Sequence, residues 1–274
     1  MTTTVTTIAP RAAARPEPAT PRPAGPLRAS AAMAGRALRR MRHEPEQMAD
    51  AIAVPIVFTV LFTYLFGGAL AGSTHDYLQF LLPGTLALAV VFVTVYTGVT
   101  LNRDLATGAF DRFRSLPVWR PAPIVGGLIG DAGRYLLAAS LVIALGLIMG
   151  YRAGGGAPGV LAAVALVIVF AVSLSWAWTA LGLLLRTPNA VMSVGFVILF
   201  PITFLSNVFV APDTMPAALR AFADVNPITH LVTAARGLMD GTATVGQVLW
   251  VLAAAAVLNA LFAPLTTRLY RRRG

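Results

Sequence analysis

Long runs of apolar residues alternate with short polar connections along most of this chain. A bilayer core of about 30 Å needs about twenty helical residues to cross it. The runs that meet this requirement lie near residues 51–72, 80–101, 128–150, 159–185, 190–210 and 246–267. The pattern therefore predicts an all-α polytopic membrane protein with six transmembrane helices. Pro55, Pro83 and Pro201 fall inside the runs, and we expect kinks there because bilayer helices tolerate proline.

The segment before the first run divides into two parts. Residues 1–26 contain six prolines and no apolar run, which predicts a disordered cytosolic tail. In residues 27–44 the apolar positions, Leu38 and Met41 among them, recur every three or four residues, whereas most arginines, such as Arg39 and Arg40, lie off this stripe. We predict an amphipathic helix lying in the headgroup layer, with an ordinary solvated helix or a part of the tail as the alternatives. Residues 45–274 then form the transmembrane domain.

The connection between the last two runs is long. It extends from about residue 210 to residue 245 and contains the moderately apolar stretches 217–225 and 228–238. These stretches are too short to cross a bilayer, so we predict short external or re-entrant helices.

The arginines are distributed unequally between the two sides of the predicted bundle. Eighteen lie before the first run, in the second connection counted through Arg134, in the fourth connection or after the last run, and only Arg152, Arg220 and Arg236 lie on the other side. Connections rich in arginine stay on the cytoplasmic side of a membrane. Both termini are therefore predicted to be cytoplasmic.

Composition narrows the class of protein further. The chain is 57% hydrophobic and 12% charged, and its net charge of +10 comes from arginines placed between apolar runs, which argues against a nucleic-acid surface. With no cysteine, it has no disulfide and no thiolate nucleophile. It also has no lysine, which a P-loop needs to reach nucleotide phosphates. If ATP is used, another polypeptide binds it, and this chain carries no cofactor.

No enzymatic or metal-binding pattern is present. His43, His75 and His230 stand on different segments without metal-like spacing to carboxylates. The aspartates, Asp131 included, map to loops or helix ends, whereas a proton-driven transporter needs acids buried in its spans. We predict a transport subunit that is not an enzyme.

One cytoplasmic segment, residues 102–117, mixes charges with apolar anchors. Phe110 and Phe113 are suited to seat against a partner while Asp111, Arg112 and Arg114 fix its orientation. The alternative on chemistry alone is a loop that binds lipid headgroups.

Several short motifs follow one another along the chain: residues 77–84 (YLQFLLPG), 111–117 (DRFRSLP), 204–210 (FLSNVFV), 215–216 (MP), 226–229 (NPIT) and 236–238 (RGL). In wording and order they resemble the motifs of the type-2 ABC exporter permeases, and within that family those of the daunorubicin-resistance (DrrB-type) branch. The resemblance covers most of the chain from about residue 28 onward.

The resemblance implies a permease that pairs with a second copy or a homologue and sits on two copies of an ABC ATPase, which bind ATP and Mg²⁺. It implies a bacterial inner-membrane location with lipid around the spans. It also assigns three groups of residues. The residues assigned to a coupling helix are Arg103, Asp104, Gly108, Phe110, Asp111, Arg112, Phe113 and Arg114. Those assigned to an interface helix are Leu38, Arg39, Arg40 and Met41. Those assigned to a substrate cavity between the second and fifth spans are Phe92, Tyr96, Thr97, Phe196, Phe200 and Phe204.

Aromatic faces with a few hydroxyls suit a flat amphipathic drug, although each cavity residue is equally suited to helix packing. A proton-driven efflux transporter and a membrane scaffold without transport activity stay open as alternatives.

Overall fold

The computed structural model describes residue 35 and residues 45–107 and 122–272. The tail 1–26, most of the interface helix 27–44 and the predicted coupling residues from Gly108 to Arg114 lie outside these ranges. Within them the regular structure is entirely helical. The elements are α2 (Pro45–Ala71), α3 (Thr74–Val93), α4 (Val95–Ala106), α6 (Ala122–Ile148), α7 (Gly156–Leu184), α8 (Pro188–Phe204), the 3₁₀ turn η1 (Pro212–Thr214), α9 (Ala217–Val225), α10 (Pro227–Asp240) and α11 (Val245–Arg272).

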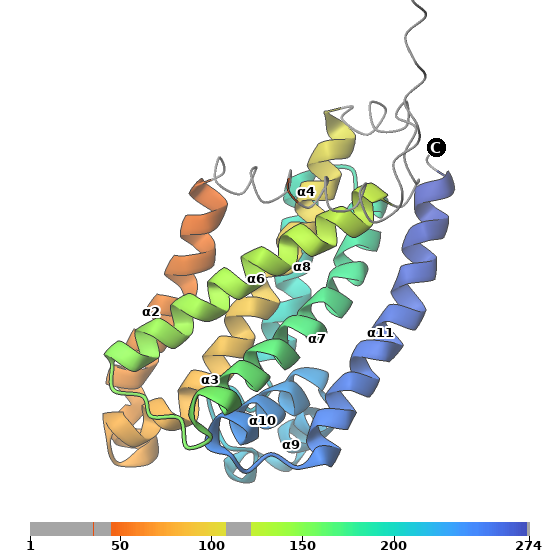
Figure 1. The fold of residues 1–274 in the computed structure, drawn as a ribbon. Helices are drawn as coiled ribbons and strands as arrows, with labels where there is room; N and C mark the ends of the chain where they lie inside the picture. The colour runs from red at the N-terminus through yellow and green to blue at the C-terminus, as the bar shows by residue number, and fades with distance from the viewer. Residues whose placement is uncertain (1–34, 36–44, 108–121, 273–274) are drawn as a thin grey trace, which may run out of the picture.

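The long helices run between two ends of one bundle. The start of α2, the end of α4 and the end of α11 lie at one end, shown at the top of Figure 1, and α9 and α10 lie at the other. We call these the α4 end and the α10 end. The described chain therefore enters and leaves the bundle at the same end.

Four helical segments of the described chain are long and apolar enough to cross a membrane: Thr74–Ala106, Gly126–Ile148, Gly156–Leu184 and Val245–Arg272. The apolar parts of α2 and α8, Pro55–Ala71 and Pro188–Phe204, are shorter. The protein is thus an all-helical polytopic membrane protein, and the count of six spans stays a prediction.

The predicted span boundaries need two corrections. The fifth run was expected to stay helical to residue 210, but α8 ends at Phe204, and residues 205–211 form an irregular connection. The second run was expected to begin near residue 80, but α3 begins at Thr74. The helix continues through Pro83 and divides at Thr94, whose N–H and hydroxyl both donate to the carbonyl of Val91. Hydroxyl groups that bond their own helix backbone commonly bend it.

Local sequence explains how α10 begins and ends. The Asn226 side chain accepts a hydrogen bond from the N–H of Ile228, and Pro227 occupies the first turn, where its missing N–H costs nothing. At the other end Gly241 adopts a φ of 77°, which favours glycine. The Asn226 side chain also donates to the carbonyl of Ile202, which ties α10 to α8.

The helices α3 and α7 form the centre of the bundle. Nearly every side chain of α3 from Leu81 to Val93 is buried. By contrast α11 packs on α7 and α10 and leaves large apolar side chains such as Leu261 exposed. Exposed apolar faces of this kind suit a helix that contacts lipid.

A close crossing lies between α4 and α7. A Cβ atom built on Gly98 would clash with the carbonyl oxygen of Trp178, and one built on Gly182 would clash with the backbone of Gly98. Small residues permit such backbone contact between membrane helices.

We expect Gly98→Ala to lower the free energy of unfolding by about 1–3 kcal/mol, because the new methyl group meets backbone that cannot turn aside. Unfolding in detergent measures the effect. The matched control is Gly127→Ala, since nothing in the described chain lies within 4 Å of that position. Equal losses of stability in the two variants would show that the crossing is not tightly packed.

Candidate functional site

The predicted coupling residues that the structure describes lie at the α4 end. Arg103 and Asp104 belong to the last turn of α4, where Arg103 is exposed and Asp104 is partly buried. The chain continues from α4 through residues 108–121 into α6. The two helices that carry this segment are therefore α4 and α6.

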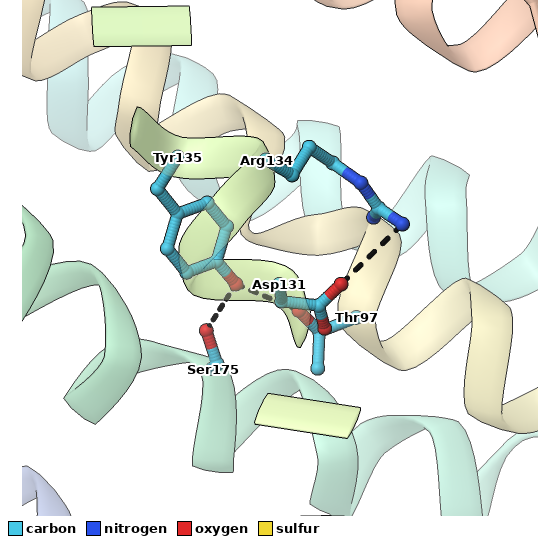
Figure 2. A network of polar contacts seen from close by, with 5 residues as sticks. All are labelled: Thr97, Asp131, Arg134, Tyr135 and Ser175. Atoms are coloured by element: carbon cyan, nitrogen blue, oxygen red, sulfur yellow. Dashed lines mark hydrogen bonds and ion pairs between the residues drawn. The ribbon is translucent and has the colours of Figure 1, made fainter. Parts of the chain in front are cut away.

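A buried polar network connects α6 to α4 and α7 (Figure 2). The hydroxyl of Tyr135 lies 2.8 Å from that of Thr97 on α4 and 2.6 Å from that of Ser175 on α7. On the same helix Arg134 forms an ion pair with Asp131, with 3.3 Å between Nη2 and Oδ1. All five side chains are buried. The network thus links the helix that follows residues 108–121 to the helix that precedes them.

Asp131 and Arg134 contradict the expectation that the aspartates fall in loops or at helix ends. The helix α6 begins at Ala122 rather than near residue 128, so both side chains lie inside it. Their spacing of three residues lets each charge compensate the other. The sequence-based argument against proton-driven transport is weakened accordingly.

The predicted cavity residues separate into different surroundings. The rings of Phe92 on α3 and Phe196 on α8 lie 5.4 Å apart, which brings the second and fifth runs together. Thr97 takes part in the polar network, and Tyr96 is buried. Phe200 stacks on Phe204 at 4.2 Å and is half exposed.

Four further phenylalanines that sequence reasoning missed join this group. The ring of Phe204 lies 5.8 Å from that of Phe58 on α2 and 4.9 Å from that of Phe209, which in turn lies 4.5 Å from that of Phe62. Phe66 follows Phe62 at 5.2 Å. We call this set the aromatic cluster: Phe58, Phe62, Phe66, Phe200, Phe204 and Phe209. The spacing of four residues between Phe58, Phe62 and Phe66 on α2 is the sequence signal that could have identified their common face.

The motifs at residues 77–84, 204–210 and 226–238 meet at the α10 end. Tyr77 donates from its hydroxyl to the carbonyl of Phe209 at 3.1 Å. Arg236 donates to the carbonyls of Phe80 and Asn207, and its guanidinium carbon lies 3.9 Å from the centre of the Phe80 ring. Motifs far apart in the sequence therefore form one contact region.

Electrostatics in this region follow from burial. Burial lowers the pKa of Arg236 to about 10, while the nearby Asp240 and Tyr151 oppose the shift. Burial raises the pKa of Tyr151 to about 12, and it also raises the pKa of Asp240, against the effect of Arg236. Arg236 stays a cation at neutral pH.

No three His, Cys, Asp or Glu side chains come together to hold a metal ion within residues 45–107 and 122–272.

The chain is similar to known membrane transport proteins over most of its length. A model of the ABC-2 type transporter family matches residues 29–239. The daunorubicin resistance ABC transporter permease protein DrrB1 of Streptomyces coeruleorubidus is 49% identical over 87% of this chain and 84% of that protein.

More distant relatives agree with this match. The probable doxorubicin resistance ABC transporter permease protein DrrC of Mycobacterium tuberculosis is 23% identical over 78% of this chain and 79% of its own length. The inner membrane transport permease YadH of Escherichia coli is 25% identical over 66% of this chain and 72% of its own length. The chain belongs to the ABC-2 type transporter family.

Proposed function

We propose that this protein is the permease subunit of an ATP-driven exporter in the bacterial inner membrane, and that it moves an amphipathic drug or a similar hydrophobic compound. Its membership of the ABC-2 family carries the proposal. Relatives named as daunorubicin and doxorubicin resistance permeases support the substrate class. The energy source in this proposal is ATP. A separate subunit binds it with Mg²⁺, since this chain has no lysine for a P-loop.

We further propose six crossings of the membrane, by α2, α3 with α4, α6, α7, α8 and α11, with both termini in the cytoplasm. The excess of arginine in the connections at the α4 end supports this orientation. The α4 end then faces the ATPase, and α9 and α10 lie on the external side as short external or re-entrant helices.

The functional unit we propose contains two ATPase copies and a second permease copy or homologue. Residues 103–114 form the coupling helix that contacts the ATPase, and the amphipathic helix 27–44 lies beside it. Motion of the coupling helix reaches both α4 and α6 because it is attached to both. The hydrogen bonds of Tyr135 to Thr97 and Ser175 make the two helices move with α7 rather than separately.

The substrate path runs along the aromatic cluster and the pair Phe92 and Phe196. Phe196 and Phe200 are 40% and 51% exposed, so their rings offer free faces to a flat ligand. The contacts of Phe204 with Phe58 and Phe209 extend this surface from α8 to α2 and towards the α10 end. Successive rings give a planar compound a series of similar stacking positions.

A proton-driven exporter is the second candidate, because Asp131 is an acid buried inside a spanning helix. Vesicles distinguish the two: export that collapses with the proton gradient at constant ATP favours the second candidate. Export that needs ATP and survives an uncoupler favours the first.

Purified alone, the permease is expected to hydrolyse no ATP, and with its cognate ATPase it should form a stable, active complex. Replacing Asp111, Arg112 and Phe113 together by alanine should abolish both the complex and its transport, because the docking contacts are lost. Arg268→Ala, on the exposed end of α11, is the control at the same end of the bundle. If the triple variant still forms the complex, this segment is not the coupling helix.

The variant Tyr135→Phe tests the polar network. It removes a hydroxyl that contacts two others, at a cost of about 1–3 kcal/mol. We expect the number of substrate molecules exported per ATP hydrolysed to fall several-fold while ATPase activity persists. Tyr64→Phe, at a side chain that is 66% exposed, is the control. An unchanged ratio in Tyr135→Phe would mean that the network only stabilises the fold.

The variants Phe62→Leu and Phe204→Leu test the aromatic path. Loss of one aromatic contact costs about 0.5–1.5 kcal/mol, so the daunorubicin concentration for half-maximal stimulation of the ATPase should rise about two- to tenfold. Maximal ATPase activity should change little. Phe222→Leu on α9, at a side chain 39% exposed, is the control. If this concentration changes equally in Phe62→Leu, Phe204→Leu and Phe222→Leu, the proposed substrate path along the aromatic cluster is wrong.

A further inference from the structure

Arg236 is a partly buried cation without a carboxylate partner among the described residues. The ion pairs found in that part of the chain are Arg134 with Asp131 and Arg220 with Asp213. Asp240, one turn further along α10, acts on Arg236 only through its longer-range field. A cation withdrawn from water without an acid beside it needs other groups to stabilise it.

Backbone carbonyls and one aromatic ring supply that stabilisation. Nε and Nη2 of Arg236 donate to the carbonyl of Phe80 at 3.2 and 3.1 Å, and Nη2 also donates to the carbonyl of Asn207 at 3.2 Å. The guanidinium lies over the Phe80 ring. One side chain of α10 thus joins the first part of α3 to the connection 205–211.

The connection 205–211 is held closely at several other points. The Asn207 side chain donates to the hydroxyl of Thr233 at 2.8 Å, and the Tyr77 hydroxyl donates to the carbonyl of Phe209. On the facing helix a Cβ built on Gly84 would lie 2.9 Å from the carbonyl oxygen of Val208. Val208 is fully buried as a result.

This connection also carries one ring of the aromatic cluster. Phe209 contacts Phe62 and Phe204 at 4.5 and 4.9 Å, so it lies where the cluster reaches the α10 end. A displacement of residues 205–211 would remove the ring from the cluster. Arg236 therefore bonds the segment that carries Phe209, the ring at this end of the aromatic cluster.

The polar groups around Arg236 are not all satisfied. Within the described chain the buried Oδ1 of Asn207 and the buried hydroxyl of Tyr151 have no hydrogen-bond partner. Most buried polar atoms in folded proteins are bonded, so unbonded ones lower the cost of separating the segments. These two unbonded oxygens therefore reduce the stability of an arrangement that the other contacts hold in place.

We propose that Arg236 is a positioning residue that keeps the connection 205–211 closed over the end of the aromatic cluster, and that its release from the Asn207 carbonyl opens the path for substrate. The link between opening and ATP rests on the proposed function. Arginine suits this role because its planar, permanently charged fork donates to two carbonyls while it stacks on a ring. Lysine would keep the positive charge but lacks the planar guanidinium that donates to two carbonyls at once.

Because the chain contains no cysteine, a single introduced thiol reports on the closure. Val208→Cys places the thiol at a buried position of the connection, and a membrane-impermeant maleimide is added on the side of the α10 end. In membrane vesicles that contain the full chain and no ATP, we expect slow labelling when Arg236 is intact. Labelling should be about tenfold faster with Arg236→Gln, the order expected for loss of a charge-assisted hydrogen bond.

Two controls separate closure from general loosening. Arg220→Gln removes an exposed arginine at the same end, whose ion pair with Asp213 measures 2.7 Å, and should leave labelling slow. Ala139→Cys, a fully buried position on α6, should stay unlabelled in every variant. Arg236→Lys and Phe80→Leu should give intermediate rates at Val208→Cys.

The proposal is overturned if Arg236→Gln leaves labelling unchanged, or if Arg220→Gln accelerates it equally. Labelling of Ala139→Cys together with Val208→Cys in all the Arg236 and Phe80 variants would also overturn it, since Arg236 would then only stabilise the fold. These measurements need no ATP, so they stand even if the proposed energy source is wrong. Faster labelling of Val208→Cys during ATP turnover, with Arg236 intact, is the further result expected if both proposals hold.

Discussion

A polar group inside a lipid-embedded bundle has to find its partner within the protein, because the surrounding hydrocarbon offers none. The contacts between helices follow from this constraint. Asn102 on α4 donates to the carbonyl of Gly182 on α7 and to that of Leu185, which follows the end of α7. The indole of Trp178 donates to Thr94 at the division between α3 and α4. Asn259 on α11 reaches Ser173 on α7 in the same way. These polar side chains join helices that also pack together through apolar faces.

Helical architecture was predictable from the sequence because the apolar runs are long and because proline and glycine mark the ends of several helices. The two short stretches after residue 210 are helical as well, as α9 and α10. The end of α8 at Phe204 was not predictable from hydropathy, since residues 205–211 are as apolar as a helix interior. There the helix ends because the connection is bonded to α3 and α10, which are distant in sequence.

The candidate site was predictable only where a short pattern carried the signal. Phe92 and Phe196 do meet, and Phe200 and Phe204 belong to one group of rings. Asp131 was misplaced because a charge pair three residues apart resembles a polar connection in a hydropathy profile, whereas burial neutralises it within one helix. The roles of Phe209 and Arg236 depend on backbone carbonyls of other segments, and a sequence pattern contains no information about those.

The crossing of Gly98 and Gly182 is a backbone contact, and such a contact lets one helix tilt on another without moving any side chain between them. It divides the rod Thr74–Ala106 unequally. At 1.5 Å per residue, roughly 12 Å lie on the side of the α4 end and roughly 36 Å on the other. The joint at Thr94 lies within the longer part, four residues from the crossing, so α3 and α4 do not act as one rigid lever. The short helix α4 is therefore the part that this contact leaves to tilt, while the buried α3 stays packed at the centre of the bundle.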